Sequence, residues 1–179
     1  MSNAAPDQLE LVRSFVNTYD HEDQTESLPD PGALTTWLDA NGLGAPQAGA
    51  ADVERARELR EALRAILHQH GGMDLDPDAA RTIDAAARRA QLAVTFDDDG
   101  EAVIRPLARG VDGALGRLLV TIADAQRDGT WSRLKACAAE DCQYAFYDRS
   151  RNRSAVWCDM KVCGNRQKVR SFRQRHTHS

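Results

Sequence analysis

The sequence has no long hydrophobic run and no recognisable leader. Its longest nearly apolar stretch, LGRLLVTIA, is interrupted by Arg117 and falls far short of the roughly 20 apolar residues that a membrane helix needs. The first residues, MSNAAPDQLELV, contain neither a basic segment nor an apolar core, so a secretory signal is not expected. These absences predict a cytoplasmic protein without a membrane partner.

Catalytic signatures are equally scarce. The sequence contains no glycine-rich phosphate loop, no HExxH motif and no pattern that suggests a Ser-His-Asp triad. Five histidines occur among 179 residues, and His21, His68 and His70 lie far upstream of every cysteine. We therefore expect that the protein is not an enzyme.

The charge is distributed unevenly along the chain. The formal net charge is −4, yet residues 127–179 hold twelve Lys and Arg against five Asp and Glu, while the remaining residues hold eleven against twenty-two. A local positive field attracts anionic partners more than the net charge suggests. The basic C-terminal part therefore indicates a polyanion such as nucleic acid, unless the acidic and basic parts simply attract each other.

The first part of the chain reads as a helical domain over residues 1–132. Apolar residues recur at helical spacing in five segments, which are residues 6–20, 33–44, 45–72, 76–90 and 113–131. We expect Asp52 to cap the third helix and Gly71 to end it. Two alternating segments, QLAVTF and EAVIRPLA, flank the turn DDDG and predict a β-hairpin. The predicted class is mostly α with a small hairpin (α+β).

All four cysteines lie in the remaining part, residues 133–179. Cys137 and Cys142 are separated by four residues, Cys158 and Cys163 again by four, and the two pairs by fifteen. Two close pairs joined by a finger-length loop suit a tetrahedral Zn²⁺ site, and a reducing cytoplasm disfavours disulfides. Four thiolates leave no open position for catalysis, although iron could fill the same shell. The sequence predicts one structural zinc.

The zinc would stabilise a segment too short to fold on its own core. QYAFYD and AVWC have strand-like composition around the turn RSRNRS, and GNRQKVRSFRQRH predicts a terminal helix. We expect Val169 and Phe172, three residues apart, to pack back on the zinc core. The expected unit is a treble-clef-like or ribbon-like zinc finger that ends in a basic helix.

Arginines gather at the predicted loop tip and along the terminal helix. Phosphate contacts from such groups bind DNA, whereas stacking on Tyr144, Phe146, Tyr147 or Trp157 would favour RNA. Two alternatives explain these charges without nucleic acid: the helix could simply be solvated, or the basic residues could form salt bridges with the acidic part of the chain. The candidate nucleic-acid contacts are Arg149, Arg151, Arg153, Arg166, Lys168, Arg170 and Arg173.

The segment DRSRNRSAVWCDMKVCGNRQK resembles the CGNR zinc-finger family of bacterial proteins, and FVNTYD followed by ERARELREALRAI resembles the ABATE domain that precedes that finger. The resemblance implies that the four cysteines bind zinc, that Gly164, Asn165 and Arg166 complete the signature, and that the protein is a stress-induced, DNA-binding transcription regulator. Ala155 and Val156 stand where members commonly carry two basic residues.

Gly164 is expected to permit a tight turn after the last cysteine. Asn165 is expected to bond the backbone of the cysteine knuckle, as we call the two short loops at residues 137–142 and 158–163. In the helical domain, Asn17 and Thr18 with Arg60 are candidates to bind a small-molecule effector, although such polar groups also serve as local caps. The leading hypothesis is a zinc-dependent DNA-binding regulator whose N-terminal domain senses a ligand or forms a homodimer. The alternative is a zinc-stabilised protein-interaction module that binds no nucleic acid.

Overall fold

The computed structural model describes residues 5–44, 47–74 and 76–176. Helices make up most of the part before residue 133, which we call the helical body. The five helices found there agree with the five helical segments predicted from the apolar periodicity. They are α1 (Asp7–Val16), α2 (Pro31–Ala40), α3 (Ala50–His70), α4 (Pro77–Arg89) and α5 (Gly110–Arg127).

Strands occur in three antiparallel pairs. The predicted hairpin is confirmed as β3 (Leu92–Phe96) with β4 (Ala102–Pro106). A short pair joins β1 (Tyr19–Asp20) to β2 (Thr25–Glu26) and was not predicted. The first helix was expected to run to residue 20, but α1 ends at Val16 and the last two of those residues form β1, so that part of the prediction is wrong. The third pair joins β5 (Leu134–Ala136) to β6 (Ala145–Tyr147). The mostly helical fold with small strand pairs is therefore confirmed.

The start of α3 differs from the prediction. The helix begins before Asp52, with Gly49 as its N-cap residue, and the Asp52 carboxylate accepts the Gly49 backbone N–H at 2.7 Å. Asp52 thus occupies the third helical position of a capping arrangement, where a carboxylate also suits the positive end of the helix dipole. The prediction of Asp52 as N-cap is wrong, whereas the predicted end at Gly71 is confirmed.

The core of the body forms where α1, α2, α3 and α5 meet. Its fully buried side chains include Val12, Phe15, Leu34, Leu38, Leu63, Leu67 and Leu118. Leu134 and Ala145, from β5 and β6, belong to the same cluster, and β5 packs against α3. The last part of the chain, residues 133–176, is called the finger below. Its first strand pair is therefore built on the core of the body.

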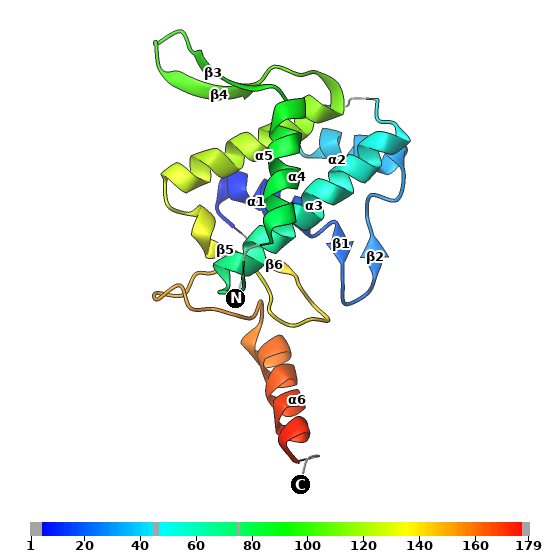
Figure 1. Cartoon of the computed structure of the whole chain (residues 1–179), viewed down its shortest axis with the longest axis vertical. Coiled ribbons are helices and arrows are strands. Elements are labelled where there is room, and N and C mark those ends of the chain that lie inside the picture. The colour runs from blue at the N-terminus through cyan, green and yellow to red at the C-terminus, as the bar shows by residue number, and fades with distance from the viewer. Residues whose placement is uncertain (1–4, 45–46, 75, 177–179) are drawn as a thin grey trace.

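The finger continues from β6 through a long loop into a π-helical turn, η2 (Met160–Gly164), and then α6 (Asn165–His176). A 3-10 turn, η1 (Trp131–Arg133), connects it to α5. Figure 1 shows that α6 projects from one end of the molecule, while the β3–β4 hairpin stands at the opposite end. Among the described residues, no helix has the length and apolar character required to cross a membrane.

Candidate metal centre and basic surface

The four cysteines converge at one point of the finger. Cys137 and Cys142 come from the loop between β5 and β6, and Cys158 and Cys163 come from the segment that leads into α6. All four sulfur atoms lie within 4.8 Å of one another, and Sγ of Cys158 is 3.6 Å from those of both Cys142 and Cys163. Tetrahedral zinc at about 2.3 Å from each sulfur requires S···S distances of roughly 3.8 Å. The cluster fits a single structural zinc ion.

The thiols also show the electrostatic signature of a cation site. Hydrogen bonds from Cys142 and Cys158 lower the pKa of Cys137 to about 2. The hydrogen bond with Cys137 in turn raises the pKa of Cys142 to about 12, and burial raises the pKa of Cys163. Without a cation, the cluster thus favours ionisation of one thiol, Cys137, and disfavours ionisation of a second thiol beside it. A divalent ion removes this repulsion and allows every ligand to ionise.

Gly164 and Asn165 of the CGNR signature support the turn after the last ligand. A Cβ atom on Gly164 would lie 2.5 Å from Sδ of Met160 and 3.1 Å from Cδ1 of Trp157. The φ angle of Gly164 is not positive, so the advantage of glycine here is the close approach of Trp157 and Met160, and not a left-handed turn conformation. Asn165 donates its side-chain N–H to the Lys161 carbonyl at 3.0 Å, in accord with the expected bond to the knuckle backbone.

A residue that sequence reasoning missed, Asp159, begins this turn. Its side chain caps η2 by accepting the backbone N–H groups of Lys161 at 2.6 Å and Val162 at 3.1 Å. Its place directly after Cys158 and before a helical turn is the signal that could have identified it as a cap.

The strand predicted at AVWC is not formed. Residues 155–157 are irregular and share one backbone bond with the knuckle, from Ala138 N–H to the Val156 carbonyl at 3.1 Å. The prediction of a second strand here is therefore wrong.

A buried ion pair holds the loop after β6. Lys135 Nζ donates to the Asp148 carboxylate at 2.8 Å and to the carbonyls of Arg153 and Ala155. Asp148 also accepts the backbone N–H groups of Ser150 and Ala155. Burial raises the pKa of Asp148, but the bonds from Lys135 and Ser150 outweigh this and hold it at about 2. Sequence reasoning missed this pair, which closes the loop and fixes its base.

The closed loop carries three of the predicted arginines, and residues 149–153 are called the arginine loop below. The guanidinium carbon of Arg149 lies 5.6 Å from the centre of the Tyr147 ring. Arg151 and Arg153 are exposed within the turn. All three side chains are therefore exposed on a loop whose base is held by the Lys135–Asp148 ion pair.

The basic residues predicted along α6 differ in their surroundings: two of them bind carboxylates of the protein, and two others are exposed. Arg166 donates to Asp141 at 2.8 Å and to Glu22 at 2.6 Å, and Arg170 donates to Asp141 at 2.9 Å. The hydrogen bond from Arg166 lowers the pKa of Asp141, and that bond and the one to Glu22 raise the pKa of Arg166. These two arginines tie α6 to the cysteine knuckle and to the turn after β1. Lys168 and Arg173 are exposed on the same helix.

The apolar side chains of α6 do not pack on the zinc core. Val169 is 49% and Phe172 56% exposed, so the prediction that they cover the core is wrong. The reason is geometric: Cys163 and Gly164 are the last described residues that are buried in the finger, and beyond them α6 runs outward from the knuckle, as Figure 1 shows.

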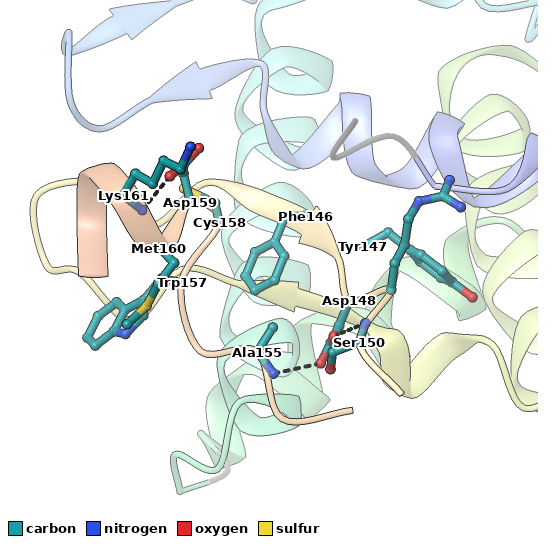
Figure 2. A pocket seen from close by; sticks show the side chains of 11 residues that line it. Phe146, Tyr147, Asp148, Ser150, Ala155, Trp157, Cys158, Asp159, Met160 and Lys161 are labelled. Atoms are coloured by element: carbon teal, nitrogen blue, oxygen red, sulfur yellow. Dashed lines mark hydrogen bonds between the residues drawn. The ribbon is translucent and has the colours of Figure 1, made fainter. Parts of the chain in front are cut away.

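A cavity of about 480 Å³ lies between the arginine loop and η2. Figure 2 shows Trp157 and Met160 on one side of it, Asp148 and Ser150 on the other, and the ring of Phe146 between them. Arg149 and Lys161 also line it. The finger thus combines an apolar hollow with cationic groups beside it.

The three candidate effector-binding residues do not line this cavity. The Asn17 side chain pairs with the backbone of Ala145, and the Thr18 hydroxyl donates to the Phe15 carbonyl. Arg60 is buried, donates to Thr18 and binds both carboxylate oxygens of Glu26. The structure brings Thr18 and Arg60 together, but each of these polar groups already has a partner in the protein.

Two family models match the chain. The CGNR zinc finger model covers residues 133–176. The ABATE model, described as "Putative stress-induced transcription regulator", covers residues 9–142. The chain belongs to the ABATE family. No curated protein matches it. The ABATE match runs through β5 and ends at Cys142, which accords with the packing of β5 on the core of the body.

Proposed function

We propose that this ABATE protein is a bacterial, cytoplasmic transcription regulator whose zinc finger binds nucleic acid, with double-stranded DNA as the first candidate. The observation that carries the proposal is the cationic arginine loop, held on a closed, zinc-stabilised scaffold by Lys135 and Asp148. Phosphate binding needs cations presented on a rigid frame, because freezing long side chains costs conformational entropy. The proposed role is binding and not catalysis.

The direction of α6 supports the same proposal. A helix that projects from its domain can enter the major groove or lie along the phosphate backbone, and Lys168 and Arg173 are exposed on it. The apolar cavity next to the arginine loop could take an unstacked base, so single-stranded RNA is included in the test below.

The helical body is proposed to sense an effector or to mediate dimerisation. An effector at Asn17, Thr18 and Arg60 would have to replace existing bonds, above all the two between Arg60 and Glu26. Such a ligand would therefore need to be an anion that can take the place of the Glu26 carboxylate.

A protein-docking module is the second candidate, and a specific contact favours it. Arg166 is bound by Glu22 of the body and by Asp141 of the knuckle. In this alternative the basic helix is a structural anchor, and zinc stabilises a surface for a protein partner.

Fluorescence anisotropy of the zinc-loaded full chain separates the two candidates. Random duplex DNA and single-stranded RNA are titrated across a salt series. About four phosphate contacts should give a slope of log affinity against log salt near −3 to −4 for duplex DNA. The variant Arg149→Ala, Arg151→Ala, Lys168→Ala should lose most of this binding. The matched control Arg81→Ala, Arg88→Ala removes exposed charge from α4 and should bind normally. No binding by the folded wild type at low salt would favour the docking module.

A further inference from the structure

The β3–β4 hairpin exposes the most prominent apolar side chains of the body. Val94 is 66%, Phe96 73% and the following Leu107 57% exposed. The hairpin stands at the end of the molecule opposite α6 (Figure 1). A two-stranded hairpin is only marginally stable on its own, and exposed apolar strands commonly mark an interaction surface.

One face of the hairpin is supported at its base and unsupported toward its tip. At the base, a Cβ atom on Gly116 of α5 would lie 2.9 Å from Cβ of Pro106 and 3.5 Å from Cδ2 of Leu92. Val94 pairs with Ile104 across the strands, and these residues share the face of Leu92 and Pro106, because alternate strand residues point the same way. The apolar face therefore continues outward from its contact with α5.

The outer edge of β4 is free to pair. The backbone bonds from Asp97 to Glu101 and from Leu107 to Gln91 mark the hydrogen-bonded positions of the hairpin. Because these positions alternate along an antiparallel pair, Ala102 and Ile104 direct their N–H and C=O groups to the other edge. Within the part of the chain that the structure describes, the sheet contains β3 and β4 alone, so no described strand lies beside this edge.

We propose that a second copy of the chain pairs with this edge, β4 antiparallel to β4, about a two-fold axis at Val103. In this register Ala102 bonds Ile104 of the partner subunit, and Glu101 lies opposite Arg105 of the partner subunit. The symmetry creates the charge pair twice. The sequence of the strand is thus complementary to itself, as an isologous interface requires.

Pro106 supports this register over its neighbour. An axis at Ile104 would place Pro106 opposite Ala102, and proline has no N–H to donate. The axis at Val103 uses only the backbone groups of Ala102 and Ile104. It also gives oppositely charged neighbours at both ends of the pairing, which stabilise antiparallel strands.

The resulting sheet has four strands with the apolar residues of both hairpins on one face. Antiparallel pairing sets the tip of each hairpin beside the base of the other, where that face rests on α5. Ala102 at one tip then lies beside Ile104 of the partner subunit, near the supported end of the partner's hairpin. Val94 and Phe96, on β3, become part of one continuous apolar face of the four-stranded sheet. It also leaves both fingers exposed at the far ends.

The inference deepens the dimerisation role proposed above for the helical body and rests on that part of the proposed function. Its test uses no nucleic acid, so its failure would leave the nucleic-acid-binding proposal untouched. Sedimentation and light scattering of the zinc-loaded full chain should show a concentration-dependent dimer. Glu101→Arg and Arg105→Glu each create two like-charge pairs, so each should raise the dimer dissociation constant at least about tenfold. An equal mixture of the two variants should dimerise again, because one copy then supplies both arginines and the other both glutamates.

Asp98→Arg is the matched control, since it reverses a charge in the same hairpin turn without facing Arg105 in this register. It should leave dimerisation unchanged. The inference is overturned if the wild type stays monomeric at every concentration, or if both reversals leave the dimer intact. Variants that remain monomeric when mixed, although circular dichroism and zinc content show them folded, would overturn it as well.

Discussion

The side-chain amide of Asn17 pairs with both backbone groups of Ala145. Asn17 Nδ2 donates to the Ala145 carbonyl at 2.9 Å, and the Ala145 N–H donates to Asn17 Oδ1 at 2.8 Å. Asn17 ends α1 and Ala145 lies in β6, so the amide acts toward β6 as a neighbouring strand would. This contact ties the β5–β6 pair of the finger to the body.

Replacing Asn17 with Ala should therefore destabilise the whole chain. The substitution leaves two backbone groups of a buried strand residue without partners, which costs about 1–3 kcal/mol of the free energy of unfolding. Urea unfolding followed by circular dichroism would measure the loss. Asn152→Ala, at an exposed loop position, is the control and should cost little. Equal stability of the two variants would contradict the role of Asn17.

Local patterns in the sequence predicted the helices, the hairpin and the metal ligands, because periodicity, turn residues and cysteine spacing act over short distances. The contact between Asn17 and Ala145 joins residues 128 positions apart, and no local pattern announces it. Val169 and Phe172 show the same limit. Two apolar residues three apart indicate one face of a helix. Whether that face is buried depends on the direction in which α6 leaves η2, which the local sequence does not reveal.

The buried pair of Lys135 and Asp148 should show strong coupling. Lys135→Met or Asp148→Asn alone leaves one buried charged group without its partner, at a cost of about 3–5 kcal/mol. The double variant Lys135→Met, Asp148→Asn should cost clearly less than the sum of the two single variants, as measured by a double-mutant cycle in urea. Additive costs would show that the two side chains act independently.

The pKa of Asp148 sets the pH range of that stabilisation. Because it is lowered to about 2 in the folded state, the contribution is complete above the ordinary Asp pKa of about 3.9 and is lost as the pH falls toward 2. The stability difference between wild type and Asp148→Asn should hold at neutral pH and shrink only in strong acid. A difference that shrank near neutral pH would contradict this assignment.

Removal of zinc should unfold the knuckle and α6 while the body keeps its helices. Cys158→Ser removes one of four ligands, and structural zinc contributes on the order of 10 kcal/mol to the folding of small modules. Zinc content should fall from one ion per chain, and hydrogen exchange should accelerate in residues 137–144 and 148–176. Leu134 and Ala145 belong to the core of the body, so β5 and β6 should retain more protection. Loss of all helical signal would contradict this division.

Mild acid should weaken the junction between α3 and β5. Burial lowers the pKa of His70, whose Nδ1 lies 2.7 Å from the Leu134 carbonyl oxygen, and burial also lowers the pKa of His68. In the unfolded chain the histidine pKa is near 6.5, so below about pH 7 the unfolded state binds more protons than the folded state. The free energy of unfolding should fall as the pH drops below about 7, and His70→Gln should reduce this slope. An unchanged slope would show that His70 does not contribute.

Asp141→Asn tests whether the carboxylates at α6 restrain its cations. Asp141 accepts from both Arg166 and Arg170, and the amide removes the charge that holds them while preserving the side chain's shape. Glu22 still binds Arg166 in this variant, so the main effect is on Arg170. If α6 meets phosphates, the released Arg170 should tighten duplex binding and steepen the salt slope by up to about one. Asp84→Asn on α4 removes an exposed carboxylate that pairs with Arg88 and should change neither quantity. Weaker binding by a zinc-loaded, folded Asp141→Asn would instead show that these ion pairs hold α6 in its binding position.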